Sequence, residues 1–146
     1  MSLAPGVLIS VAQRFVTAYQ SGTKTAEVRR RRLNVDPGTS IWIYTKLPIG
    51  RVELAGRVEQ VVGGPPTRLW KKYGRRTGLT KQEFFTYVRG CEVAYLVLIT
   101  HISVLAAQLS LRELRRMKRG FQPPQFAKKI GNEDVLHRAL TDASAI

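Results

Sequence analysis

The sequence predicts an α+β fold in which helices surround a small mixed β-barrel. The 146 residues are the size of one ordinary domain. Short β-branched segments separated by Gly/Pro turns indicate strands, and capped amphipathic segments between them indicate helices. The expected order is strand, helix, three strands, two helices, a long strand and a helix. We assign residues 1–130 to this domain and 131–146 to a polar C-terminal tail, for which a short, loosely held helix is considered.

The first expected strand and helix lead into a charged strand. Val7 to Val11 is short, apolar and β-branched, which predicts a strand. Apolar residues at helical spacing then predict a helix that stops at Gly22. From 23 to 32, Ala26 and Val28 alternate with charged residues, so a strand with one thin apolar face is expected.

Turn signals and an apolar run indicate three further strands. The segment 41–45 is rich in β-branched and aromatic residues and follows a Pro-Gly turn. The segment 51–62 alternates apolar and charged residues, which predicts a half-exposed strand. The segment 93–105 is nearly all apolar, and we expect a central strand buried on both faces.

Helix boundaries are marked by caps. A helix with proline in its first turn is expected to end at Gly74. Thr80 and Glu83 have capping-box spacing and predict the start of the next helix. Ser110 and Glu113 have the same spacing and predict the start of the last one.

Charge makes nucleic acid the leading class of partner. The chain carries 24 Lys and Arg against 10 Asp and Glu, a formal net charge of +14 at pH 7. Such a field attracts polyanions. A membrane surface is the competing class, but the arginine run does not belong to an amphipathic helix with an apolar face. We therefore expect RNA, either single-stranded or modified, with DNA as an alternative, and no membrane.

The cysteine content and the apolar runs indicate the cellular compartment and whether a metal site or a membrane span is expected. The single cysteine, Cys91, excludes an intramolecular disulfide and a zinc site built on paired cysteines. The longest apolar run, Val93 to Ile99, is far below the roughly 20 residues that a membrane span needs, and no basic segment precedes the N-terminal apolar run. These features indicate a cytoplasmic protein with no metal site and no cofactor.

Basic side chains form three groups along the chain. Four consecutive arginines end the strand at 23–32, and side-chain alternation directs two of them to each face. Because guanidinium groups match phosphate oxygens in a bidentate way, this run is either a solvated strand end or a phosphate clamp. Like charges repel within the other two groups, and a polyanion would relieve that repulsion. The candidate nucleic-acid-binding residues in these groups are Arg29, Arg30, Arg31, Arg32, Lys71, Lys72, Arg75, Arg112, Arg115, Arg116 and Arg119.

Lys24 and Glu27 lie three residues apart, directly before the arginines. An exposed salt bridge or two solvated side chains is the ordinary interpretation of such a pair. The alternative places Lys24 in a partly desolvated cleft, where neighbouring arginines lower its pKa and Glu27 orients it or shuttles a proton. That arrangement would suit hydrolysis or transfer at a nucleobase, so both are candidate catalytic residues.

Trp42 and Tyr44 share one face of the strand at 41–45. Aromatic side chains at this spacing are more often part of a core, because each buries a large apolar area. The alternative is a groove in which a base stacks, and Tyr44 is the candidate for that role.

These residues also resemble a known family. The segment G-T-K-T-A-E-V-R, 22–29, resembles the G-x-K-x-x-E-x-R signature of the ASCH domain, a branch of the PUA-like β-barrel superfamily. The family's opening strand and helix are similar to LISVAQRFVTAYQSG, and its turn, strand and proline element is similar to DPGTSIWIYTKLP. Its helical insert and closing helix resemble RLWKKYGRRTGLTKQEFFTYVRG and SLRELRRMKRGFQPPQ. The resemblance covers Val7 to Phe126 and implies a pseudo-barrel whose cleft is lined by the signature strand.

The resemblance leaves three functions open. The first is recognition of RNA or a modified nucleobase in a cleft lined by Lys24, Glu27 and Arg29. The second is hydrolysis, by a ribonuclease or by an amidohydrolase acting on acetylated cytidine. In the amidohydrolase branch the signature lysine, here Lys24, is catalytic. That branch has threonine at the position of Glu27, and it has a later glutamate that has no convincing match in this chain.

The third function is a basic DNA-binding or ribosome-associated regulatory module, although the chain has no helix-turn-helix signature. The oligomeric state stays open.

Overall fold

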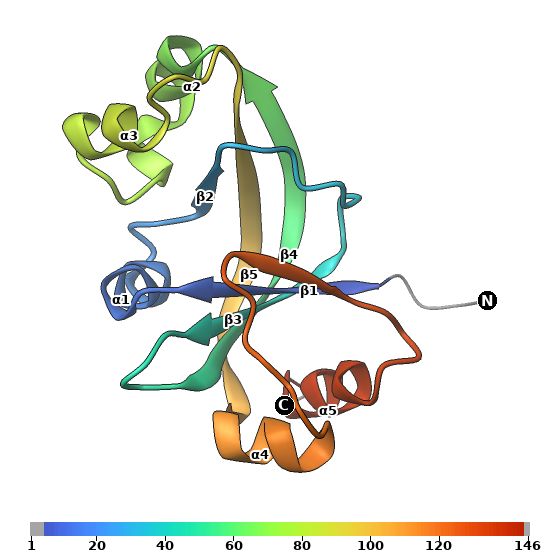
Figure 1. Cartoon of the computed structure of the whole chain (residues 1–146). Helices are drawn as coiled ribbons and strands as arrows, with labels where there is room; N and C mark the ends of the chain where they lie inside the picture. Colours follow the sequence, from blue (N-terminus) through green and yellow to red (C-terminus); the bar gives the residue numbers. More distant parts are fainter. Residues whose placement is uncertain (1–4, 145–146) are drawn as a thin grey trace.

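A six-stranded mixed sheet organises residues 5–144, which are the residues that the computed structural model describes (Figure 1). Its strand order is β2-β5-β4-β3-β1-β6. The β1 and β3 strands are parallel, and the other neighbours are antiparallel. The strands are β1 (Gly6–Val11), β2 (Ala26–Arg29), β3 (Ser40–Thr45), β4 (Arg51–Gly64), β5 (Ala94–Ser110) and β6 (Ala127–Ile130).

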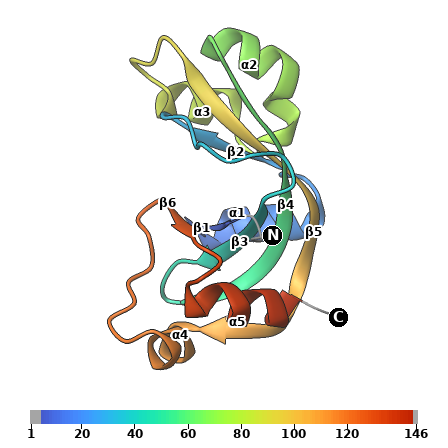
Figure 2. The same cartoon turned by 90° about the vertical axis from the view of Figure 1, so that its right-hand side faces the viewer.

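The long strands β4 and β5 curl this sheet into a half-barrel (Figures 1 and 2). Register shifts interrupt their pairing at three places between Val52 and Gln60. An extra residue in one strand bends it and increases the local twist. The expectation of a small mixed barrel in an α+β fold is thereby confirmed.

Helices cover the two ends and one side of the half-barrel (Figures 1 and 2). At one end, the chain between β4 and β5 forms α2, a short 3₁₀ helix η1, and α3. The opposite end carries α4 and α5, and α1 follows β1 at the side. The helices are α1 (Gln13–Ser21), α2 (Pro66–Tyr73), η1 (Gly74–Arg76), α3 (Lys81–Tyr87), α4 (Leu111–Met117) and α5 (Val135–Ser144). None of the helices in the described part of the chain has the length and apolar character needed to cross a membrane.

The predicted helix caps are present. Gly74 is the C-cap of α2. At α3 the Thr80 hydroxyl accepts from the Glu83 N–H, and the Glu83 carboxylate accepts from the Thr80 N–H. At α4 the Ser110 hydroxyl accepts from the Glu113 N–H and donates to the Glu113 carboxylate. These caps satisfy N–H groups that have no partner inside the helix.

Three elements differ from the sequence expectation. The strand expected at 23–32 is limited to β2, because only Ala26 to Arg29 pair with β5. The β6 strand is an addition to the expected elements, and it pairs with β1. Within β5, the residues from Leu96 to Ile99 are buried, whereas those from Thr100 to Val104 are partly or fully exposed.

The C-terminal helix is held more firmly than expected. Within α5, Leu136, Leu140 and Ala143 are buried and belong to the same cluster as Trp42. The Trp42 indole N–H donates to the Ser144 hydroxyl at 3.0 Å. A loosely held helix is therefore the wrong description, because the apolar face of α5 packs against the sheet.

Candidate nucleic-acid interface

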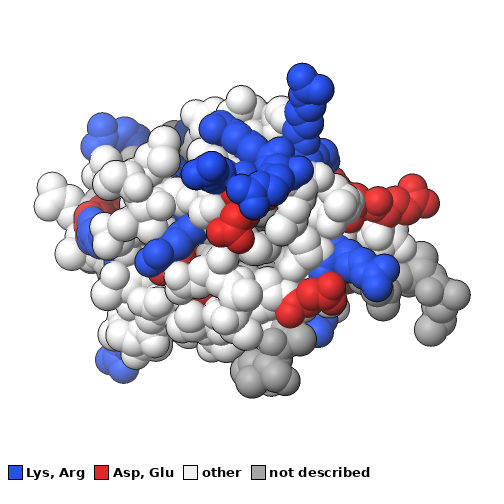
Figure 3. All heavy atoms as spheres, turned by 90° about the horizontal axis from the view of Figure 1, so that it is seen from below, with Lys and Arg blue, Asp and Glu red and all other residues white. Residues whose placement is uncertain are grey.

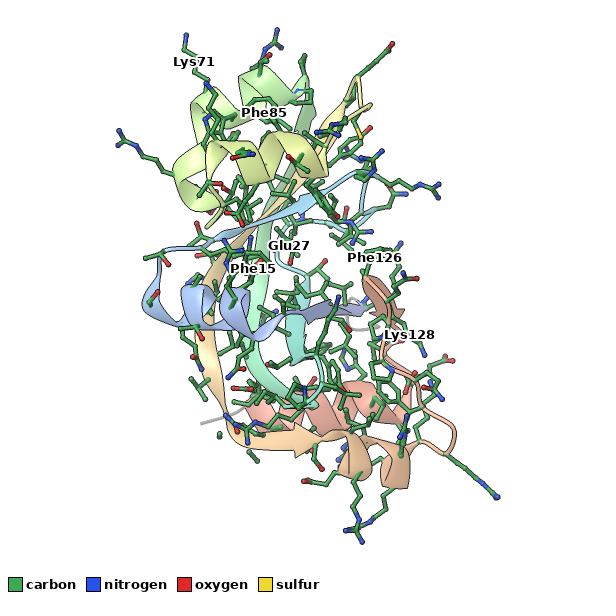
Figure 4. All side chains as sticks on the ribbon, turned by 60° about the vertical axis from the view of Figure 1, so that its left-hand side comes forward. Phe15, Glu27, Lys71, Phe85, Phe126 and Lys128 are labelled. Carbon is green, nitrogen blue, oxygen red and sulfur yellow. The ribbon has the colours of Figure 1, made fainter. Side chains whose placement is uncertain are left out.

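A cleft of about 320 Å³ is lined by two of the signature residues, Lys24 and Glu27, whereas Arg29 lies outside its lining. Its lining comes from β1, α1, β2, α3 and the segment before β6. Figure 4 shows Phe15, Glu27 and Phe126 along the gap between β2 and the layer formed by α1 and β1. Sites for small molecules measure about 300–1,000 Å³, so the cleft could hold a single nucleobase-sized group.

Lys24 is a buried cation at the wall of this cleft, with 2% of its surface exposed. Its Nζ donates to the Ala26 carbonyl at 2.9 Å and to the Thr77 carbonyl at 2.6 Å. Burial lowers the pKa of Lys24, the charge of Glu27 acts in the opposite direction, and Arg14 lowers it further. The cation that contributes is thus Arg14 rather than the arginine run. An ammonium has three N–H donors, so one is left for a ligand.

Backbone contacts on both sides position Lys24. The α1 helix ends at Gly22, whose φ of +82° turns the chain, and the Lys24 N–H donates to the Ala18 carbonyl. An isolated β-bridge then joins Lys24 to Thr77. The next residue, Gly78, has a φ of +69° and lies against the Lys24 side chain. The loop after η1 therefore forms one wall of the lysine site.

Glu27 faces the cleft from β2, since strand alternation places it opposite the buried Ala26 and Val28. Tyr19 donates its hydroxyl hydrogen to Glu27 Oε2 at 3.2 Å. Burial raises the pKa of Tyr19 well above its ordinary value, and the Glu27 charge adds to that effect, so Tyr19 remains a neutral donor. Among residues 5–144, no ion pair joins Lys24 to Glu27. The two signature residues share the cleft without neutralising each other.

Glu83 is a cleft residue that the sequence assigned only to a helix cap. Its carboxylate forms a bidentate ion pair with Arg14, with Nη1–Oε2 at 2.6 Å and Nη2–Oε1 at 2.8 Å. The hydrogen bond from Arg14, followed by that from the Thr80 N–H, lowers the pKa of Glu83 to about 2. The pair joins α1 to α3 beside the cleft. The capping box signalled the position of Glu83 in its helix, but no local pattern connects it to Arg14, 69 residues earlier.

A second and larger pocket of about 690 Å³ adjoins the cleft, and we call it the arginine pocket. The side chains of Tyr87 and Phe126 line the cleft, the arginine pocket and a smaller pocket between them. Glu27 and Arg29 both border that smaller pocket. The basic residues of the arginine pocket are Arg29, Arg30, Arg31 and Lys128.

The arginine run divides between structure and surface. One Arg30 Nη donates to the carbonyls of Tyr87 and Arg89, at 2.8 and 2.9 Å, and thereby holds the end of α3. Arg29 and Arg31 border the arginine pocket with no acidic partner among the described ion pairs. Arg32 is exposed and lies outside the lining of this pocket.

The other two predicted basic groups lie at opposite ends of the molecule (Figures 1 and 2). The α2 group is on α2 and η1, and the α4 group is on α4 and the residues just after it. Figure 3 looks at the end formed by α4 and shows Lys and Arg side chains gathered there. Lys71, Lys72 and Arg75 border a separate pocket of about 500 Å³ beside Trp70. The group at the α4 end is Arg112, Arg115, Arg116 and Arg119.

Within the α4 group, Arg115 has a structural role. Its Nε donates to the Phe121 carbonyl at 3.1 Å, and its Nη2 donates to the Gln122 side chain at 3.3 Å. Of the three predicted basic groups, only the run from Arg29 to Arg31 borders a pocket that adjoins the cleft.

Tyr44 does not form a stacking surface. It is 2% exposed and packs with Trp42 in the cluster under α4 and α5. The alternation that places both side chains on one face is confirmed, but that face is covered by the two C-terminal helices. The groove interpretation is wrong, because a buried ring has no face left for a base.

Metal binding has no structural support in the described residues. Between 5 and 144, no group of three or more His, Cys, Asp or Glu side chains is placed to hold a metal ion. Cys91 is a free, partly buried thiol.

Comparison with known proteins gives a consistent set of relatives. No family model matches the chain. It is 34% identical over 128 residues to an ASCH domain-containing ribonuclease of Zymomonas mobilis, an alignment that covers 88% of this chain and 86% of that protein. The crystal structure of an ASCH protein from Z. mobilis superposes with a TM-score of 0.85 at 29% identity, covering 93% of this chain and 94% of the other. A crystal structure of a mutant of that protein has a TM-score of 0.87 at 28% identity, covering 96% and 99%.

A more distant structure shares the fold alone. Human THYN1 protein, solved in complex with 5-methylcytosine-containing DNA, has a TM-score of 0.52 at 7% identity. The alignment covers 98% of this chain and 99% of that protein.

Proposed function

Because this chain belongs to the ASCH domain family, we propose that it binds RNA, with a nucleobase in the cleft beside Lys24 and Glu27 and adjoining phosphates on the arginines. One observation carries this proposal. The cleft that contains Lys24 and Glu27 adjoins a pocket bordered by Arg29, Arg31 and Lys128. A site for one neutral polar ring thus lies beside a site for anions.

The groups in the cleft suit the edge of a base. Glu27 offers carboxylate oxygens to N–H donors, and Lys24 offers an N–H to a carbonyl or ring nitrogen. Unpaired RNA bases are read through such hydrogen bonds on their edges. Guanidinium groups at Arg29 and Arg31 match phosphate oxygens. RNA is favoured over DNA because the similar Z. mobilis protein is named a ribonuclease.

Hydrolysis of RNA is the second candidate function. It is favoured by the lowered pKa of Lys24 in the same cleft as the Glu27 carboxylate. In that reaction, Glu27 takes the proton of a 2′-hydroxyl as its oxygen attacks phosphorus, and Lys24 stabilises the charge that develops on the phosphate oxygens. The bond from phosphorus to the 5′-oxygen breaks, that oxygen receives a proton from Lys24 or from water, and a 2′,3′-cyclic phosphate remains, which a water molecule opens to complete the hydrolysis.

Binding and product formation should be measured on the same samples. A fluorescent single-stranded RNA is titrated with wild-type protein, Lys24→Met and Glu27→Gln at several salt concentrations, and the RNA is then analysed by mass spectrometry. Lys129→Met removes one exposed charge outside the cleft and is the matched control. Removal of a charge-assisted hydrogen bond should weaken binding about tenfold or more in the two cleft variants and leave the control unchanged.

The outcomes separate the functions. Intact RNA after salt-sensitive binding supports recognition without cleavage. Cleaved RNA with wild type, and intact RNA with both cleft variants, supports the ribonuclease. Absence of RNA binding, or tighter binding to duplex DNA than to RNA, would overturn the proposal.

A further inference from the structure

Two exposed aromatic side chains stand between the cleft and the arginine pocket. Tyr87 is 41% exposed and ends α3, and Phe126 is 55% exposed and precedes β6. The two residues are far apart in the sequence and come from opposite sides of the gap. Both line the cleft, the arginine pocket and the small pocket between them. A group that passes from one pocket to the other meets both rings.

The backbones of these residues are anchored while their rings stay accessible. The Tyr87 carbonyl accepts from Arg30 Nη1 at 2.8 Å. The Phe126 carbonyl accepts from the Ser10 N–H at 3.0 Å. These hydrogen bonds hold the backbone at both positions, while both side chains stay exposed. A backbone that is already fixed reduces the freedom lost when a ligand binds.

The two rings do not pack on each other, and each borders both the cleft and the arginine pocket. Among residues 5–144, the aromatic pairs that touch do not include Tyr87 with Phe126. Arg29 and Arg31 lie on one side of the pair, and Glu27 and Lys24 lie on the other. A nucleotide carries its chemical groups in the matching order, because its base has a π-face and is attached through the sugar to a phosphate.

We propose that Tyr87 and Phe126 form an aromatic gate at which the base of an unpaired nucleotide stacks, so that the site takes single-stranded RNA and excludes duplexes. This inference rests on the proposed function and adds its substrate class. Bases of a duplex are stacked on each other and paired, so their faces are not available to protein rings. Stacking on aromatic side chains is tolerant of sequence, because every base has a π-face.

The test uses single-stranded RNA that carries one 2-aminopurine, whose fluorescence falls when it stacks. The full-length protein is compared with Tyr87→Ala and Phe126→Ala, and with Tyr87→Phe and Phe126→Tyr, which retain an aromatic ring. Tyr73→Ala is the control, because Tyr73 is an aromatic residue beside Lys72 that lines none of the three pockets. Circular dichroism establishes that each variant is folded, and a matched RNA duplex is titrated in parallel.

We expect quenching and tight binding with wild type, and binding weakened roughly 5- to 100-fold with loss of quenching in each gate variant to alanine. The two aromatic replacements and Tyr73→Ala should behave as wild type. Salt-sensitive RNA binding that is equal in wild type and both alanine variants would overturn the gate and leave the proposed function intact. Equal affinity for the duplex would also overturn it. Absence of RNA binding by wild type would overturn both proposals.

Discussion

Opposing effects act on the pKa of Lys24. Burial disfavours its charged form, whereas the nearby charge of Glu27 favours it. The Ala26 and Thr77 carbonyls also favour the charged form, because they accept its hydrogens. The net effect is a lowered pKa. An amine with a lowered pKa gives up its proton more readily at neutral pH than an exposed lysine does, which suits a residue that orients or protonates a ligand.

The shape of the lysine site depends on Gly78. Its φ is +69°, and a Cβ there would lie 3.0 Å from the Lys24 Cβ. We expect Gly78→Ala to lower the free energy of unfolding by more than the about 1–2 kcal/mol that a left-handed residue costs. It should also weaken RNA binding, because Lys24 has to shift. Urea denaturation and RNA titration measure the two effects.

Gly90→Ala is the matched control for this prediction. Gly90 has a φ of +83°, and nothing lies within 4 Å of an added Cβ. It should therefore show the backbone cost alone and bind RNA normally. Equal destabilisation and equal RNA binding in the two variants would contradict the close packing of Gly78 on Lys24.

At the scale of elements, α1 and α3 are linked beside the cleft by the pair Arg14–Glu83. The α1 helix packs against the middle of the sheet through Val16 and Tyr19, whereas α3 packs against β2 and β5 through Phe84. The ion pair therefore connects two separately packed walls of one site. Because both side chains are substantially exposed, the pair should be sensitive to salt.

This link predicts a pH dependence of stability. The pKa of Glu83 is lowered from 4.5 to about 2 in the folded protein. A carboxylate with a lowered folded pKa stabilises the protein above its unfolded pKa, and the contribution is lost as the pH falls toward the folded value. The free energy of unfolding of wild type should exceed that of Glu83→Gln at neutral pH, and the difference should shrink from about pH 4.5 downward.

Urea denaturation over this pH range measures the difference. Glutamine also suits the last position of a capping box, so Glu83→Gln retains the cap and removes the charge. Glu133→Gln serves as the control, since Glu133 is exposed and absent from the described ion pairs. A difference that stays constant with pH, or one unaffected by high salt, would argue against the ion pair.

At the scale of the whole molecule, the net charge of +14 is spread over separate surfaces. The α2 and α4 groups occupy opposite ends, and only Arg29, Arg30, Arg31 and Lys128 lie at the arginine pocket (Figures 1 and 3). Long-range attraction depends on total charge, whereas direct binding of phosphate depends on position. The two contributions can therefore be separated with variants of equal charge.

Two triple variants to glutamine make this comparison. One changes Arg29, Arg31 and Lys128, and the other changes Arg112, Arg116 and Arg119, so each removes three charges from the same total. For a short single-stranded RNA, the first should lower the slope of log affinity against log salt by about 0.7 for each phosphate that the protein no longer neutralises. The second should leave the slope unchanged. An equal decrease of slope in both variants would show that binding is not confined to the arginine pocket.

Local rules explain what could be predicted from the sequence. The Thr80 and Glu83 cap, the Gly22 stop and the alternation of β2 all depend on neighbours within a few residues. The two signature residues are predicted together for the same reason, since Lys24 and Glu27 are three residues apart. By contrast, β6 has the sequence AKKI, in which two lysines are adjacent, so apolar and charged residues do not alternate along it.

The sequence by itself determined the class of fold, the capped ends of α1, α2, α3 and α4, the family resemblance and the positive field. Only the tertiary structure decided that Tyr44 is buried, that Glu83 pairs with Arg14, and that Tyr87 and Phe126 stand at one opening. The physical reason is the distance along the chain over which each kind of interaction acts. Propensity, capping and alternation act between neighbours along the chain, whereas burial and ion pairing depend on which distant elements the curled sheet brings together.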